Sequence, residues 1–184
     1  PIHVMSSLTV SRAAQQSLAA QEESWERALQ EWLQDPRLVA CYRGPSKQRS
    51  RVLENLASGG TSATQVIVVG ATPCVNRWGR GGQAFDYTRF GSRSRVALRE
   101  EMNDISLVCW VRINSLNNLF NSLFLTDGHE EGEPHWQILR DGRIFFSVKH
   151  PHRKGTSWRQ TVFYSPPIWR KAMSGEWNML AVTY

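Results

Sequence analysis

The sequence predicts an all-β protein, an antiparallel β-sandwich or jelly roll with one α-helix near its N-terminus. After Pro36, short stretches rich in β-branched and aromatic residues alternate with turn sequences such as "GRGG" at 79–82. No helical pattern separates consecutive strands, which argues against a fold built from βαβ units. Apolar residues make up 41% of the 184 residues, enough for a sizeable core.

The predicted helix spans residues 12–34, and it is the one segment with a clear helical period. Its apolar residues fall on one face: Trp25, Ala28, Leu29, Trp32 and Leu33. Asp35-Pro36 ends it, because proline has no N–H to donate and restricts the residue before it. We therefore divide the chain into a linker and amphipathic helix (1–34) and a sandwich domain (35–184).

The sandwich domain contains a series of predicted strands. These are 37–43, 65–71, 83–89, 94–98, 104–113, 121–127, 135–140, 143–149, 159–165 and 177–184. Residues 51–57 suit either a helical turn or an irregular sheet edge. Asp141-Gly142 predicts a two-residue type I′ hairpin turn, since both positions of that turn need a positive φ. The hairpin then places Trp136 in the core rather than in a sugar-stacking platform.

Three stretches carry a resemblance to a known family: "WGRGGQAFDY" (78–87), "DISLVCWVRI" (104–113) and "GEWNMLAVTY" (175–184). Together they resemble LamG-like domains of the concanavalin A-like lectin/glucanase fold. In that family a G-x-A-x-x-F strand precedes one with Trp-Val and a basic residue, and a W-x-x-x-A-V-T-Y strand follows. In this chain Ala84 is followed directly by Phe85, whereas the family pattern has two residues between the alanine and the phenylalanine. The family pattern also implies that Trp78, Trp169 and Trp177 mark strand ends and belong to the core.

The stretch 120–144 is similar to a bacterial subset of these domains that often follows a FecR-type signalling domain. The resemblance implies an extracytoplasmic module (periplasm or cell surface) whose parent protein is membrane-anchored. It also implies further strands after residue 184, so we expect a C-terminally incomplete jelly roll with uncovered core. The expected partner is a glycan or an extracellular protein, because the fold hosts lectins, hydrolases and adhesion modules alike.

Two loops at the rim of the sandwich are the predicted ligand-binding region, 127–135 and 149–158. Their candidate ligand-binding residues are Asp127, His129, Glu131, His135, His150, His152 and Trp158. Asp127, Glu131 and Glu133 offer carboxylates for a calcium ion, whereas the interleaved histidines suit zinc better. A solvated loop with a turn at Asp127-Gly128 explains the same residues without a metal. No other cofactor is expected.

The sequence favours a non-catalytic binding module over two alternatives. A glycoside hydrolase needs two carboxylates set across the scissile bond. The E-x-D-x-x-E strand that supplies them in related glucanases is absent, although Glu131 and Glu133 remain candidates. The second alternative is a structural spacer in which Trp25 and Trp32 dock the sandwich to an upstream domain.

The remaining patterns narrow the function further. Basic residues concentrate in three short loop-like stretches (43–51, 89–95 and 149–154) rather than on one element, so we expect no nucleic-acid partner. No apolar run is long enough to insert into a membrane. The three cysteines form no CxxC, and spacing alone leaves a Cys41–Cys74 disulfide open.

Overall fold

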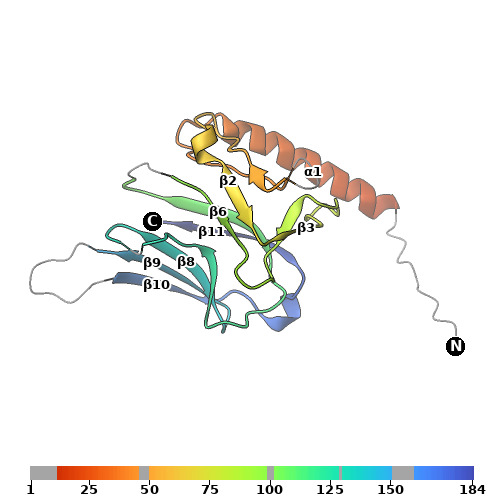
Figure 1. Cartoon of the computed structure of the whole chain (residues 1–184). Coiled ribbons are helices and arrows are strands. Elements are labelled where there is room, and N and C mark those ends of the chain that lie inside the picture. The colour runs from red at the N-terminus through yellow and green to blue at the C-terminus, as the bar shows by residue number, and fades with distance from the viewer. Residues whose placement is uncertain (1–11, 46–49, 99–101, 129, 151–159) are drawn as a thin grey trace, which may run out of the picture. The chain divides into compact units, whose positions relative to one another are not determined.

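The computed structural model is mostly β-strand in antiparallel sheets, with one α-helix among the described residues, which confirms the predicted fold class (Figure 1). It describes residues 12–45, 50–98, 102–128, 130–150 and 160–184. The chain divides into two compact units, Pro1–Glu101 and Met102–Tyr184. The division predicted from the sequence, 1–34 and 35–184, stays a prediction, as does the jelly-roll connectivity.

Helix α1 (Arg12–Leu33) begins the first unit as the sequence predicts. Its last turn tightens, because the N–H of Gln34 and the N–H of Asp35 bond to carbonyls three residues back, at 3.2 and 3.0 Å. Beyond it, the Asp35 carboxylate accepts hydrogen bonds from the backbone and guanidinium of Arg37, the closest at 2.7 Å. Leu29 is the buried centre of the apolar face, at 4% exposure.

The strands of the first unit are short. One sheet has the order β1-β2-β5, and a separate hairpin pairs β3 with β4. Their bounds are β1 Val52–Leu53, β2 Val66–Val69, β3 Thr72–Cys74, β4 Ala84–Asp86 and β5 Arg93–Arg95. The buried core consists of Val66, Val68 and Ala71. The sequence did not predict β3, whose central Pro73 disfavours a strand.

The strand predicted over 37–43 is wrong, because this segment is irregular. The side-chain amide of Asn55 provides the physical reason. Its oxygen accepts a hydrogen bond from the Cys41 N–H at 2.9 Å, and its nitrogen donates one to the Val39 carbonyl at 3.0 Å. One side chain thus satisfies backbone groups that a neighbouring strand would otherwise pair.

The second unit is a two-layer sandwich. A four-stranded sheet has the order β10-β9-β8-β7, and a two-stranded sheet pairs β11 with β6 (Figure 1). The bounds are β6 Ser106–Arg112, β7 Phe120–Phe124, β8 Pro134–Leu139, β9 Arg143–Lys149, β10 Gln160–Pro167 and β11 Trp177–Thr183; a 3₁₀ turn, η2, spans Lys171–Met173.

Trp136 is 2% exposed, which confirms that it belongs to the core of this unit. Trp136, Phe146 and Val148 of the four-stranded sheet pack against apolar residues of the other layer. Those residues are Leu107, Cys109, Leu180 and Val182. We call the face carrying Trp136 and Phe146 the inner face of the four-stranded sheet, and the opposite one its outer face.

The turn between β8 and β9 differs from the predicted two-residue turn. The N–H of Gly142 bonds to the Leu139 carbonyl at 2.9 Å, Gly142 has a positive φ of 85°, and Ile138 pairs with Ile144. The connection is therefore a three-residue loop, Arg140 to Gly142, in which glycine occupies the left-handed position. The Asp141 carboxylate accepts the N–H of Arg143 at 3.2 Å and closes the loop.

Candidate functional site

The two predicted rim loops lie together at one end of the four-stranded sheet. Pro134 pairs with Val148 and His135 with Ser147, so β8 begins where β9 ends. The N–H of Gly132 bonds to the Lys149 carbonyl at 2.8 Å, which extends this contact into the loop. The described parts of segments 127–135 and 149–158 are therefore neighbours, as a shared ligand site requires.

Within this rim, the Glu133 carboxylate accepts hydrogen bonds from nearby residues of the same connection. The same oxygen, Oε2, accepts the Thr126 hydroxyl at 2.9 Å and the backbone N–H of Glu130. Asp127 and Glu131 lie nearby in sequence. No group of three or more metal-ligating side chains comes together in the residues the structure describes. The calcium site at Asp127, Glu131 and Glu133 stays a prediction.

The histidines of the rim have separate surroundings. His150 Nε2 contacts the Thr161 hydroxyl across the β9–β10 ladder, and His135 lies on β8 at half-buried depth. His129, His152 and Trp158 lie outside the described residues. The structure thus brings Glu133, His135 and the end of β9 to one rim without assembling a metal centre from described side chains.

An exposed aromatic row on the outer face was missed by the sequence analysis. It consists of Phe120 on β7, Phe145 on β9 and Tyr164 on β10. The ring centroids of Phe120 and Phe145 are 5.4 Å apart, and those of Phe145 and Tyr164 are 5.5 Å apart, both edge to face. Phe145, which contacts both other rings, is 8% exposed. Phe120 and Tyr164 remain 45% and 55% exposed.

Polar side chains accompany the aromatic row on the same face. Alternate residues of a strand share a face, so His135 and Gln137 lie on the same side of the sheet as Phe145. Gln137 Nε2 donates to the Ser122 hydroxyl at 3.3 Å. Arg143 lies 5.0 Å from the Tyr164 ring centroid while its Nε bonds to Asp141 at 2.8 Å. On this face His135 therefore lies between the aromatic row and the rim.

A sequence signal for this row was present in two aromatic doublets, Phe145-Phe146 early in β9 and Phe163-Tyr164 in β10. Successive side chains in a strand point to opposite faces. Because Phe146 belongs to the core, its neighbour Phe145 has to face outward. The doublets thus predict aromatic rings on both faces of the sheet, whereas the sequence analysis assigned no outward role to Phe145 or Tyr164.

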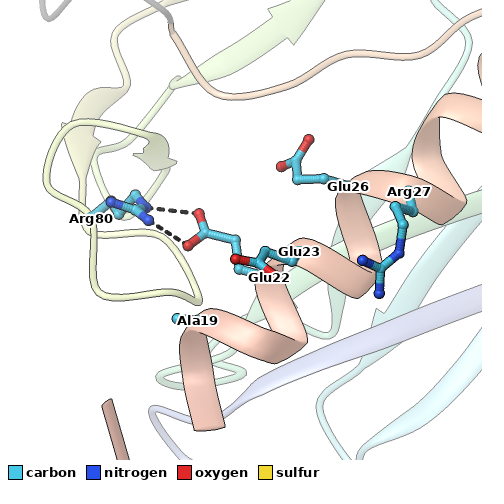
Figure 2. A pocket seen from close by; sticks show the side chains of 6 residues that line it. All are labelled: Ala19, Glu22, Glu23, Glu26, Arg27 and Arg80. Atoms are coloured by element: carbon cyan, nitrogen blue, oxygen red, sulfur yellow. Dashed lines mark hydrogen bonds and ion pairs between the residues drawn. The ribbon is translucent and has the colours of Figure 1, made fainter. Parts of the chain in front are cut away.

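A second notable cluster joins helix α1 to the β3–β4 turn in the first unit. Glu22 receives two hydrogen bonds from Arg80, at 2.7 and 2.5 Å (Figure 2). Glu26 receives two from Arg43, at 2.8 and 2.5 Å. Glu22, Glu26 and Arg80 line an open depression of about 550 Å³, together with Ala19, Glu23 and Arg27. Figure 2 shows these six side chains. These ion pairs connect helix α1 to Arg80 in the β3–β4 turn and to Arg43.

Arg77 completes the helix contact by lying between two indoles. Its guanidinium carbon is 4.2 Å from the Trp25 ring centroid and 4.1 Å from that of Trp78. Burial lowers the pKa of Arg77 to about 10, and the charge of Glu26 partly opposes that shift. The arginine remains a cation at neutral pH, so the cluster is a cation–π stack. Trp25 thus has a partner within its own unit, and the docking role predicted for Trp25 and Trp32 stays a prediction.

Cys41, Cys74 and Cys109 form no disulfide in the structure. Burial raises the pKa of the Cys109 thiol to about 11, and burial also raises that of Cys41. These thiols are therefore poor nucleophiles at neutral pH. In the described part of the chain, no helix has both the length and the hydropathy needed to cross a bilayer.

Fold and surface together define a class: a β-sandwich protein with an N-terminal helix and an outer face bearing exposed aromatic rings beside two loops. Comparison with known proteins adds no narrower assignment, because no family model, curated protein or solved structure matches this chain.

Proposed function

We propose that this chain is a non-catalytic binding module that recognises a carbohydrate through the aromatic row and the adjoining rim of its four-stranded sheet. The observation that carries the proposal is the pairing of exposed Phe120 and Tyr164 rings with hydrogen-bonding side chains on one face. A sugar presents both apolar C–H faces and hydroxyl groups. Aromatic rings cover the former, and amide, hydroxyl and guanidinium groups bond the latter.

The rim extends this surface with chemistry that suits a glycan. His135 follows the row on the same face, and Lys149 and His150 lie where the two loops meet. These groups donate hydrogen bonds to hydroxyls and, when charged, to acidic sugars. The proposed ligand therefore spans from Tyr164 toward the rim, and the rim residues predicted from the sequence become its polar end.

The arrangement of the acids supports binding over hydrolysis. A retaining glycosidase holds its two carboxyl groups about 5–5.5 Å apart with both oxygens available to substrate. Glu133 instead uses one carboxylate oxygen on Thr126 and on its own loop. We further propose an extracytoplasmic setting, in line with the resemblance to LamG-like domains that accompany FecR-type signalling domains.

The decisive experiment is a glycan-array screen with the intact chain, followed by titration of the best glycan into two matched variants. Tyr164→Ala removes a ring from the outer face. Phe163→Ala removes its neighbour, 49% exposed and on the opposite side of the same strand. We expect Tyr164→Ala to weaken binding at least tenfold, in keeping with about 1.4 kcal/mol for one stacked ring, and Phe163→Ala to leave the Kd unchanged.

Two results would overturn the proposal. The first is the absence of any glycan whose binding depends on Tyr164. The second is turnover of a β-glucan by the intact chain with Tyr164→Ala fully active, which would instead favour the hydrolase alternative. Asp127→Ala and His150→Ala measure the contribution of the rim. Binding that survives both would confine the site to the aromatic row.

A further inference from the structure

We propose that the turn at Arg89–Ser92 binds the surface of an anionic phospholipid bilayer. The Phe90 ring enters the boundary between headgroups and acyl chains, and the neighbouring arginines bond to lipid phosphates. The turn belongs to the first unit, whereas the proposed glycan site belongs to the second. The two proposals can therefore fail separately.

Hydrogen bonds hold this turn in one conformation. The N–H of Ser92 bonds to the Arg89 carbonyl at 3.0 Å, and the Ser92 hydroxyl lies 2.6 Å from the same carbonyl and 2.7 Å from that of Tyr87. Gly91 has a φ of 76°, so the four residues match a type II turn, whose third position needs a positive φ. Phe90 occupies the second position, at the tip, and its ring is fully exposed. The turn itself therefore presents the ring to solvent.

Phe90 differs from the other exposed apolar residues by its degree of exposure. The next most exposed large apolar side chain in the described part of the chain is Leu119, at 61%. Single apolar residues on a surface are common and do not by themselves mark a binding site. The surroundings of the ring have to show what it contacts.

The charges beside the ring are all positive. Residues 87–98 contain Arg89, Arg93 and Arg95 and no acidic residue. All three arginines are exposed. The Arg93 guanidinium donates a hydrogen bond to the Gly91 carbonyl at 3.0 Å, which keeps this cation next to the turn. The charge of the stretch therefore complements a surface that carries phosphates.

Strand β2 adds exposed apolar side chains beside the arginines. Val69 pairs with Arg93 and Ile67 pairs with Arg95, and directly paired residues share a face of the sheet. Ile67 is 57% exposed and Val69 is 38% exposed. Apolar and cationic side chains thus adjoin each other on one face of this sheet, and that face leads up to the turn.

A bilayer suits this combination better than another polyanion does. Its interface accepts apolar side chains at the acyl boundary, and its phosphates lie at the level of the flanking cations. Single-stranded nucleic acid is bound by several rings on which successive bases stack, whereas this turn offers one ring. The contact is shallow and needs no apolar run of membrane-spanning length.

The test measures binding of the intact chain to vesicles by flotation. One set of vesicles contains phosphatidylcholine and phosphatidylglycerol in equal parts, and the control set contains phosphatidylcholine alone. We expect binding to the anionic vesicles only. It should weaken as the salt concentration rises, because salt screens exposed charges.

Variants of Phe90 test the role of the ring. Phe90→Ser should weaken binding to the anionic vesicles about fivefold or more, because serine gains nothing from the acyl boundary. Phe90→Trp should retain binding, since an indole also suits the interface. Leu119→Ser is the matched control. It removes another exposed apolar side chain, in the second unit, and should leave binding unchanged.

Arginine variants test whether the phosphates bind at this turn. Arg89→Gln combined with Arg93→Gln removes two charges and should weaken binding about tenfold or more. Arg170→Gln combined with Lys171→Gln lowers the net charge equally at exposed positions of the second unit, and should leave binding nearly unchanged. Circular dichroism checks that each variant is folded.

Several results would overturn the inference. Absent binding, or equal binding to neutral vesicles, would remove its basis. Full binding by Phe90→Ser would reduce the contact to charge alone, and equal weakening by the two double variants would show that only net charge matters. Tighter binding of a single-stranded oligonucleotide, or self-association without lipid, with the same dependence on Phe90 would assign the turn to nucleic acid or to a second copy.

Discussion

The two units of the chain are stabilised in different ways. In the second, strands of up to eight residues bury large side chains, with Trp136 and Ile138 at 2% and 1% exposure. In the first, strands of two to four residues contribute Val66 and Val68 to a small buried cluster that Ala71 completes. Short strands with small side chains remove little apolar area from water. The first unit adds paired charges, an arginine between two indoles and a bridging asparagine.

Single substitutions should therefore change the free energy of unfolding by different amounts in the two units. Exposed ion pairs contribute about 0–1 kcal/mol each, and a cation–π contact about 0.5–2 kcal/mol. Removing one large core side chain costs about 3–5 kcal/mol. The three stability predictions below use hydrogen exchange or unfolding probes assigned to one unit, so that the effect is located as well as measured, and the fourth uses the pKa of a single carboxyl group.

Trp136→Ala is expected to have the largest effect, lowering the free energy of unfolding of the second unit by about 3–5 kcal/mol. The indole fills the centre of the inner face, and neighbouring side chains cannot close the resulting cavity. Denaturant unfolding measures the loss. Trp110→Ala is the control, because that indole is 37% exposed and its removal should cost about 1 kcal/mol or less. Equal losses would show that Trp136 does not carry the core.

Gly142→Ala should rank second, at about 2–4 kcal/mol. The residue has a φ of 85°, a conformation that costs a side chain roughly 1–3 kcal/mol, and a Cβ there would collide with the Trp169 carbonyl oxygen. Gly132→Ala is matched, since its φ is 81° but no atom lies near its Cβ. Thermal unfolding should therefore separate the two variants. Equal shifts would mean that the contact with Trp169 contributes nothing.

Arg77→Met is expected to destabilise the first unit by about 1 kcal/mol. Methionine keeps an apolar stem between Trp25 and Trp78 but removes the cation. Hydrogen exchange of helix α1 should then increase while exchange in β8 and β9 stays unchanged. Arg89→Met tests the same substitution at an exposed position and should have no effect. Faster exchange in β8 and β9 as well would show that the contribution of Arg77 is not confined to the first unit.

The smallest effect concerns Asp35 at the end of helix α1. Hydrogen bonds from Arg37 lower the pKa of Asp35 from its ordinary value near 4 to about 2. A carboxyl with a lowered folded pKa stabilises the fold above its unfolded pKa, and this contribution is lost as the pH falls through about 2. NMR titration should find this low pKa, and in Arg37→Gln it should return toward the ordinary value. An unchanged pKa would show that Arg37 is not the cause.

The residues on the inner face of the sandwich could be predicted from the sequence, because the alternation of a strand and the glycine of a hairpin depend only on neighbouring residues. Trp136 and Gly142 illustrate this, although the turn has three residues instead of two. The segment 37–43 shows the limit. Its alternation suits a strand, but the distant Asn55 amide takes the hydrogen bonds that a partner strand would need. Such a competition cannot be inferred from the alternating residues alone.

The candidate surfaces depended still more on tertiary structure. Alternation assigned Phe145 and Tyr164 to strands, yet only the register of β9 against β10 and the packing of Phe120 assembled the exposed row. The sequence by itself therefore determined the fold class and the alternation of buried positions, because both depend on residues close along the chain. The tertiary structure decided which outward groups meet, because that depends on contacts between distant segments.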